Sequence, residues 1–180
     1  MKRFALFLLI ALFAGSASAN SRDPIRIATG MKPAQQVVAG IVSQALGKAG
    51  FRYEFVVIRP DLIGDALKDG KAHVHPAAIL SERPGLAERI AAGDVRTLGG
   101  LIGNGKDEDI QKLVWPGMKR KWPNAQKLLK RMVLSPEQIA DLVRALRGGA
   151  SAMELSDEWW KANRETWSPW IAASKNWMKP

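Results

Sequence analysis

Hydrophobic residues between positions 25 and 98 follow two periods in turn. Short β-branched or aromatic runs predict strands, and apolar residues three or four positions apart predict helices. Strands are expected at residues 25–28, 51–58, 72–75 and 95–98, and helices at 33–47, 61–68 and 82–92. Pro76 is expected to end the third strand. This alternation is typical of an α/β fold with a mainly parallel sheet flanked by helices.

After Gly99 the pattern predicts helices alone. A polar, glycine-rich connection over Gly99–Asp109 comes first, and Pro123 opens the next helix. Ser135 with Gln138, and Ser151 with Glu154, have the spacing of capping boxes, which begin helices. The C-terminal helices are therefore expected to pack back on the sheet.

The N-terminus has the layout of a secretory signal peptide. Two basic residues precede an apolar run from Phe4 to Ala14, and Ala17-Ser18-Ala19 follows as a small-residue cleavage site. An uncleaved anchor is disfavoured, because the run is shorter than the roughly 20 residues that a membrane-spanning helix needs. We expect cleavage after Ala19 and a mature periplasmic protein that begins at Asn20.

Composition narrows the possible chemistry. The 180 residues include no cysteine, which excludes disulfides, thiolate metal sites and cysteine nucleophiles, and only two histidines. The segment 100–107 has phosphate-loop spacing, but Asp107 stands where a hydroxyl is required, so no nucleotide role is expected. His73 and His75 share one face of a strand without a third ligand nearby, and structural roles are expected for both. No serine lies in a nucleophile elbow. The sequence therefore predicts no enzyme, no metal and no cofactor.

Two further features leave alternatives open. The segment 119–131 holds six basic residues and no acidic one, within a chain of net charge +10. It is either a solvated face or a surface for anionic lipid or a protein partner; nucleic acid is not expected for an exported chain. Five of the seven tryptophans lie between residues 159 and 177. Trp159, Trp160, Trp167 and Trp170 are interpreted as structural aromatics rather than as a ligand box.

Three segments together carry a family resemblance. Ile25-Arg26-Ile27 is followed by a helix entered near Gln35, and residues 65–76 contain A-L, a glycine and V-H-P at characteristic spacing. The segments 121–138 and 159–171 are similar to that family's closing helices. The chain thereby resembles the substrate-binding proteins of glycine betaine and choline ABC importers.

The resemblance implies a single lobe of the periplasmic binding-protein type. Residues 20–180 would form it, with a βαβ part at 20–99, a connection at 100–117 in place of the family's second lobe, and a helical closing part at 118–180. The implied partners are a small betaine-like or zwitterionic solute and an ABC permease at the inner membrane. The alternative is a non-transport periplasmic protein that keeps the lobe and docks to a membrane partner through its basic face.

The implied ligand site lies where the first and third strands end. The resemblance assigns it these residues: Met31, Lys32, Gln35, His75, Pro76 and Ile79. Ile79 occupies the position of a family tryptophan, and Met31 and Lys32 stand where an aromatic is common. An incomplete aromatic box predicts weak binding of a quaternary amine, while Lys32 suits a carboxylate.

Overall fold

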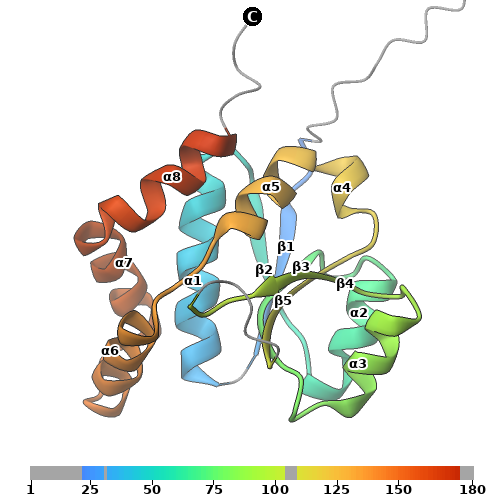
Figure 1. Ribbon diagram of the computed structural model, residues 1–180, viewed down its shortest axis with the longest axis horizontal. Coiled ribbons are helices and arrows are strands. Elements are labelled where there is room, and N and C mark those ends of the chain that lie inside the picture. Colours follow the sequence, from blue (N-terminus) through green and yellow to red (C-terminus); the bar gives the residue numbers. More distant parts are fainter. Residues whose placement is uncertain (1–21, 31, 104–108, 175–180) are drawn as a thin grey trace, which may run out of the picture.

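The computed structural model describes residues 22–30, 32–103 and 109–174 (Figure 1). The expected signal peptide at 1–19, its cleavage site, Met31 and part of the glycine-rich connection lie outside the described residues. None of the described helices is long and apolar enough to cross a membrane.

The described strands form one sheet in the order β2-β1-β3-β5-β4. β1 pairs in parallel with both β2 and β3, whereas β5 is antiparallel to both β3 and β4. The strands are β1 (Ile25–Thr29), β2 (Tyr53–Val57), β3 (Val74–Ile79), β4 (Arg96–Gly100) and β5 (Ile110–Val114). Four strands therefore run in one direction, and β5 alone opposes them within the described sheet.

Helices cover both faces of this sheet (Figure 1). One face carries η1 (Pro60–Leu62), α2 (Ile63–Lys68) and α3 (Pro84–Ala91). The other carries α1 (Pro33–Lys48), α4 (Met118–Lys121), α5 (Pro123–Arg131), α6 (Pro136–Arg147), α7 (Ala152–Ala162) and α8 (Arg164–Ser174). A large apolar core lies under α1 and the closing helices, and a smaller one lies under α2 and α3. The expectation of an α/β lobe with closing helices packed on it is confirmed.

Both predicted capping boxes are present. The Ser135 hydroxyl accepts from the Gln138 N–H, and the Ser151 hydroxyl accepts from the Glu154 N–H. In each box the side chain three positions on accepts from the N-cap N–H in return. These local contacts fix where α6 and α7 begin.

Two expectations about strands were wrong. β3 continues through Pro76 to Ile79, because a register shift between His75 and Ala78 accommodates the residue that lacks an N–H. The expected connection at 100–117 contains β5, which lies between β3 and β4. Its polar residues obscured it: Gln111 accepts from the Thr97 hydroxyl, and the buried Lys112 ammonium donates to the carbonyls of Met132 and Lys130.

Candidate functional site

The carboxyl ends of β1 and β3 meet the first turn of α1 at one edge of the sheet. Ile79 at the end of β3 also pairs with Ile110 at the start of β5. In sheets built from parallel strands, ligands bind outside the carboxyl ends of the strands. We call this region, residues 30, 32–36 and 75–83, the carboxyl edge.

Gln35 fixes the loop that joins β1 to α1. Its buried side-chain amide donates to the Ala77 carbonyl at 3.1 Å, so it ties the first turn of α1 to β3. A Cβ at Gly30 would lie 1.8 Å from Gln35 Oε1, so glycine is required there. The structure thus places Gln35 at the carboxyl edge as a positioning contact, with its side chain already engaged.

Lys32 is held by a carboxylate from another segment. Its Nζ lies 2.5 and 2.6 Å from the two carboxylate oxygens of Glu82, and both side chains are about half exposed. Sequence reasoning missed Glu82, which follows Lys32 by fifty positions. Because Glu82 balances the charge, Lys32 repels a cationic ligand less than its charge alone suggests.

His75 is inside the lobe rather than on its surface. It is 1% exposed, its Nδ1 lies 3.3 Å from the Ala28 carbonyl, and its Nε2 has no hydrogen-bond partner in the structure. Burial, with a smaller contribution from Arg83, lowers its pKa to about 4, so the ring is neutral at pH 7. Pro76 is buried beside it. The structure places both residues beneath the carboxyl edge.

Ile79 borders a small apolar cavity. The cavity of about 80 Å³ is bounded by the first turns of α1, the strand ends and α6. Its lining is Ala34, Gln35, Val38, Ala77, Ile79, Leu101, Ile102, Ile110, Ile139, Leu142, Val143 and Leu146. No aromatic residue is among them. Small-molecule pockets usually enclose about 300–1,000 Å³, so the cavity is too small to enclose a solute.

The C-terminal tryptophans lie against α1, away from the carboxyl edge cavity. Trp159 stacks on Trp170 with ring centroids 5.8 Å apart, and Trp160 lies 4.6 Å from Trp167. The Trp160 indole N–H donates to the Ile41 carbonyl of α1 at 3.1 Å. Trp159, Trp160 and Trp170 are buried, and Trp167 is partly buried.

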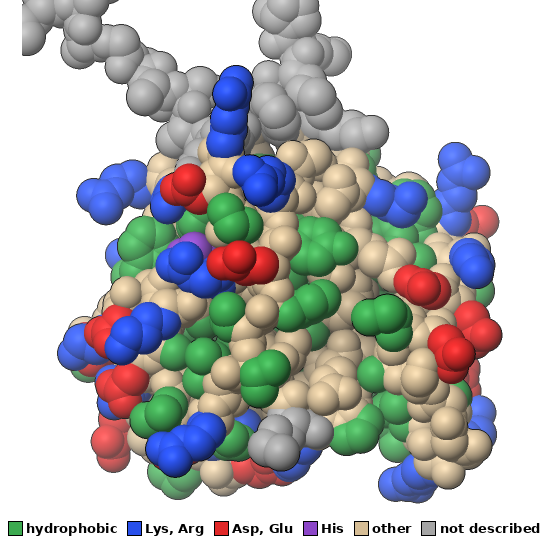
Figure 2. Space-filling model, turned by 180° about the vertical axis from the view of Figure 1, so that it is seen from behind, with side chains coloured by type: hydrophobic (Ala, Val, Ile, Leu, Met, Phe, Trp, Pro, Cys, Tyr) green, Lys and Arg blue, Asp and Glu red, His purple; other side chains and the backbone are tan. Residues whose placement is uncertain are grey.

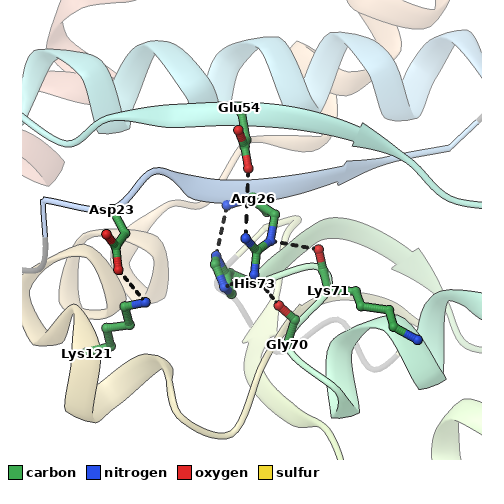
Figure 3. A network of polar contacts seen from close by, with 7 residues as sticks. All are labelled: Asp23, Arg26, Glu54, Gly70, Lys71, His73 and Lys121. Carbon is green, nitrogen blue, oxygen red and sulfur yellow. Dashed lines mark hydrogen bonds and ion pairs between the residues drawn. The ribbon is translucent and has the colours of Figure 1, made fainter.

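A second polar cluster occupies the opposite, amino-terminal end of the strands (Figure 3). The Arg26 guanidinium donates to the carbonyls of Gly70 and Lys71, and the Arg26 backbone N–H donates to His73 Nδ1 at 2.9 Å. The His73 ring lies 4.6 Å from Trp122. Burial, followed by the charges of Arg26 and Lys121, lowers the pKa of His73 to about 4. This cluster ties β1 to the start of β3.

The basic segment forms α4 and α5. Five of its six cations are exposed and make no ion pair with described residues, and Lys121 pairs with Asp23 at 2.7 Å. Beneath α5, the buried Lys112 Nζ caps the end of the helix, and burial lowers its pKa to about 8.

The sheet order and the helical layers together form an α/β lobe with the fold of the periplasmic binding proteins. The sequence model of the family described as the substrate binding domain of an ABC-type glycine betaine transport system (OpuAC) matches residues 89–162. These residues run from the end of α3 to the end of α7. The resemblance expected from the sequence motifs is thus confirmed.

Solved structures share this fold across most of the chain. Lactococcal OpuAC in complex with glycine betaine matches with a TM-score of 0.71 and 11% identity, covering 83% of this chain and 100% of that one. A glycine betaine/L-proline-binding protein (ProX) from Borrelia burgdorferi matches with a TM-score of 0.69 and 8% identity, covering 84% of this chain and 100% of that one. A choline-binding protein of an ABC transporter, in complex with choline, matches with a TM-score of 0.71 and 11% identity, covering 87% of this chain and 98% of that one.

Proposed function

We propose that the chain is the solute-binding component, or a reduced relative of it, of an ABC importer for glycine betaine- or choline-like compounds. The observation that carries the proposal is the family match over residues 89–162 within a lobe whose fold relatives hold glycine betaine or choline. In this role residues 1–19 would be removed on export, and an inner-membrane permease would receive the solute. Such proteins bind and release their solute without chemical change.

The carboxyl edge is the proposed binding surface. Lys32 at the start of α1 would meet the carboxylate of a betaine, helped by the Ala34 N–H and the positive end of the helix dipole, since the Gln35 and Gln36 N–H groups already donate to the Lys32 carbonyl. Ile79 and the adjoining apolar cavity would contact its methyl groups. If Lys32 turned toward the solute carboxylate, the Glu82 carboxylate would become free to contact the solute ammonium group.

Binding by this lobe alone should be weak. A single edge buries less of a solute than the 70–90% typical of small-molecule sites, and no described aromatic lines the cavity. Each missing aromatic contact forgoes about 1–2 kcal/mol toward a quaternary ammonium group. We therefore expect a Kd above about 1 mM for glycine betaine or choline.

Calorimetric titration with choline tests the site. The double variant Lys32→Trp/Ile79→Trp supplies two aromatic faces, and its affinity should rise at least about tenfold. Lys71→Trp, a matched change on an exposed lysine at the opposite end of the sheet, should leave the affinity unchanged. Micromolar binding by the unmodified chain would contradict the incomplete box. An unchanged affinity in the double variant would show that Lys32 and Ile79 do not face the solute.

A further inference from the structure

Four of the five exposed large hydrophobic side chains among the described residues gather on one side of the lobe, and the fifth, Leu62, is on η1. Tyr53, Phe55 and Val57 of β2 are 39, 45 and 80% exposed, and Met153 of α7 is 73% exposed. Figure 2, which shows the face opposite to that of Figure 1, has hydrophobic side chains grouped in its middle between charged margins. Single exposed apolar residues are normal on a protein surface, whereas a contiguous group of them often marks an interaction site.

A groove runs between β2 and the overlying helices. It encloses about 400 Å³ and is lined by Tyr53 and Phe55 from β2, by α1, and by Met153 and its neighbours on α7. The Tyr53 and Phe55 rings meet edge to face, with centroids 5.8 Å apart. These four apolar side chains, Tyr53, Phe55, Val57 and Met153, are called the β2 surface below.

Within the described sheet, the outer edge of β2 has no neighbouring strand. β2 is an outer strand of the described sheet, with β1 as its neighbour. The Ile25 N–H donates to the Arg52 carbonyl at 2.8 Å, so Arg52 turns its backbone groups toward β1. Since this direction alternates along a strand, Tyr53, Phe55 and Val57 turn their N–H and C=O groups outward. An edge strand with this apolar face and free backbone is a template for another strand.

We propose that a second copy of this chain pairs with β2, antiparallel, about a two-fold axis that passes by Phe55. In this register Phe55 lies opposite Phe55 of the second copy, and Tyr53 lies opposite Val57. All three outward-facing residues then exchange hydrogen bonds with outward-facing residues. Glu54 lies opposite Val56, so no like charges meet.

The two neighbouring registers are less favourable, one in its charges and the other in its hydrogen bonds. Sliding one strand by two residues so that Tyr53 faces Phe55 places Glu54 directly opposite Glu54 of the second copy, which is destabilising. The opposite slide leaves Tyr53 facing Arg59, beyond the end of β2, and loses one hydrogen-bonded pair. The strand is thus complementary to itself in one register, and this is the property that an isologous dimer interface requires.

The two-fold arrangement also covers the groove. The axis stands perpendicular to the sheet, so the α1–α7 layers of both copies lie on one face of a continuous ten-stranded sheet. Phe55 of each copy then contacts its counterpart across the axis, Tyr53 contacts Val57 of the second copy, and Met153 on each α7 lies beside the junction. The carboxyl edges remain open, so solute binding and dimerisation use separate surfaces.

Cysteine cross-linking tests the register directly, because the chain contains no cysteine. Residues in a hydrogen-bonded antiparallel pair have Cα atoms about 5.5 Å apart, within the range that a disulfide spans. Phe55→Cys should therefore form a covalent dimer under mild oxidation. Val57→Cys is the matched control: its two thiols would be displaced by four residues along the strands, about 14 Å, and should stay reduced.

Light scattering on the purified wild-type protein supplies the second measurement. We expect twice the mass of one chain at about 100 µM protein, because this concentration is well above the dissociation constant of a specific dimer. Val57→Pro removes an N–H that points away from β1, so it should abolish the dimer while the far-ultraviolet circular dichroism spectrum stays that of the folded chain. A monomeric wild type, cross-linking of Val57→Cys as fast as Phe55→Cys, or a dimer that persists in Val57→Pro would each overturn the proposal.

Discussion

The two histidines should make the stability of this protein fall between pH 6.5 and pH 5. Both rings are buried and neutral in the fold, and burial lowers both pKa values to about 4. In the unfolded chain each ring titrates near pH 6.5. Above that pH neither state is protonated and the stability is fully present. As the pH falls toward 4 the unfolded chain binds two more protons than the folded one, and the stability is progressively lost.

The magnitude follows from the width of this window. From pH 6.5 to pH 5 each histidine removes about 2 kcal/mol from the free energy of unfolding, at about 1.4 kcal/mol per pH unit. Urea titrations followed by tryptophan fluorescence at pH 7 and pH 5 measure the loss. His75→Gln should lose about 2 kcal/mol less than wild type between the two pH values, whatever its stability at pH 7. Lys71→Gln, at an exposed site, should keep the wild-type pH dependence. If His75→Gln retained the whole loss, the buried neutral state of His75 would be refuted.

Three other changes have clear expected outcomes. Trp160→Ala should cost about 3–5 kcal/mol in urea unfolding, because it removes a buried ring and its hydrogen bond to α1; an unchanged midpoint would rule out its proposed structural role. Gly30→Ala should destabilise by about 1–3 kcal/mol through the clash with Gln35, and Gly85→Ala, which has open space, should not; equal stabilities would show that the loop yields freely. N-terminal sequencing of the exported protein should begin at Asn20, and a sequence that begins at Met1 would contradict processing.

Local signals in the sequence were sufficient for most helices and for four of the strands. Ser135 and Gln138 are three positions apart, so their reciprocal contact could be predicted from spacing alone. β5 could not be predicted in this way, because Gln111 and Lys112 interrupt its apolar pattern. Their polar atoms find partners on β4 and at the end of α5, which only the folded chain brings together.

The positions of the carboxyl edge residues in the fold could be predicted from the sequence, but the contacts of their side chains could not. Gln35 and Ile79 lie there, yet the ion pair between Lys32 and Glu82 joins segments fifty residues apart and has no spacing signal. The burial of His75 likewise depends on α2 and α3 covering that face of the sheet. The exposure of β2 depends on its position at the edge, which follows from strand order rather than from the composition of the strand.

Binding of a quaternary amine at the carboxyl edge is tested most directly by amide chemical shifts during a choline titration of the ¹⁵N-labelled protein. The proposed function predicts shifts in residues 32–36 and 79–83 that are far from saturation at about 1 mM choline and approach it at tens of millimolar. Amides of Trp115 and Trp122, at the other end of the strands, should not move. Shifts centred on those tryptophans, or none up to about 50 mM choline, would contradict it.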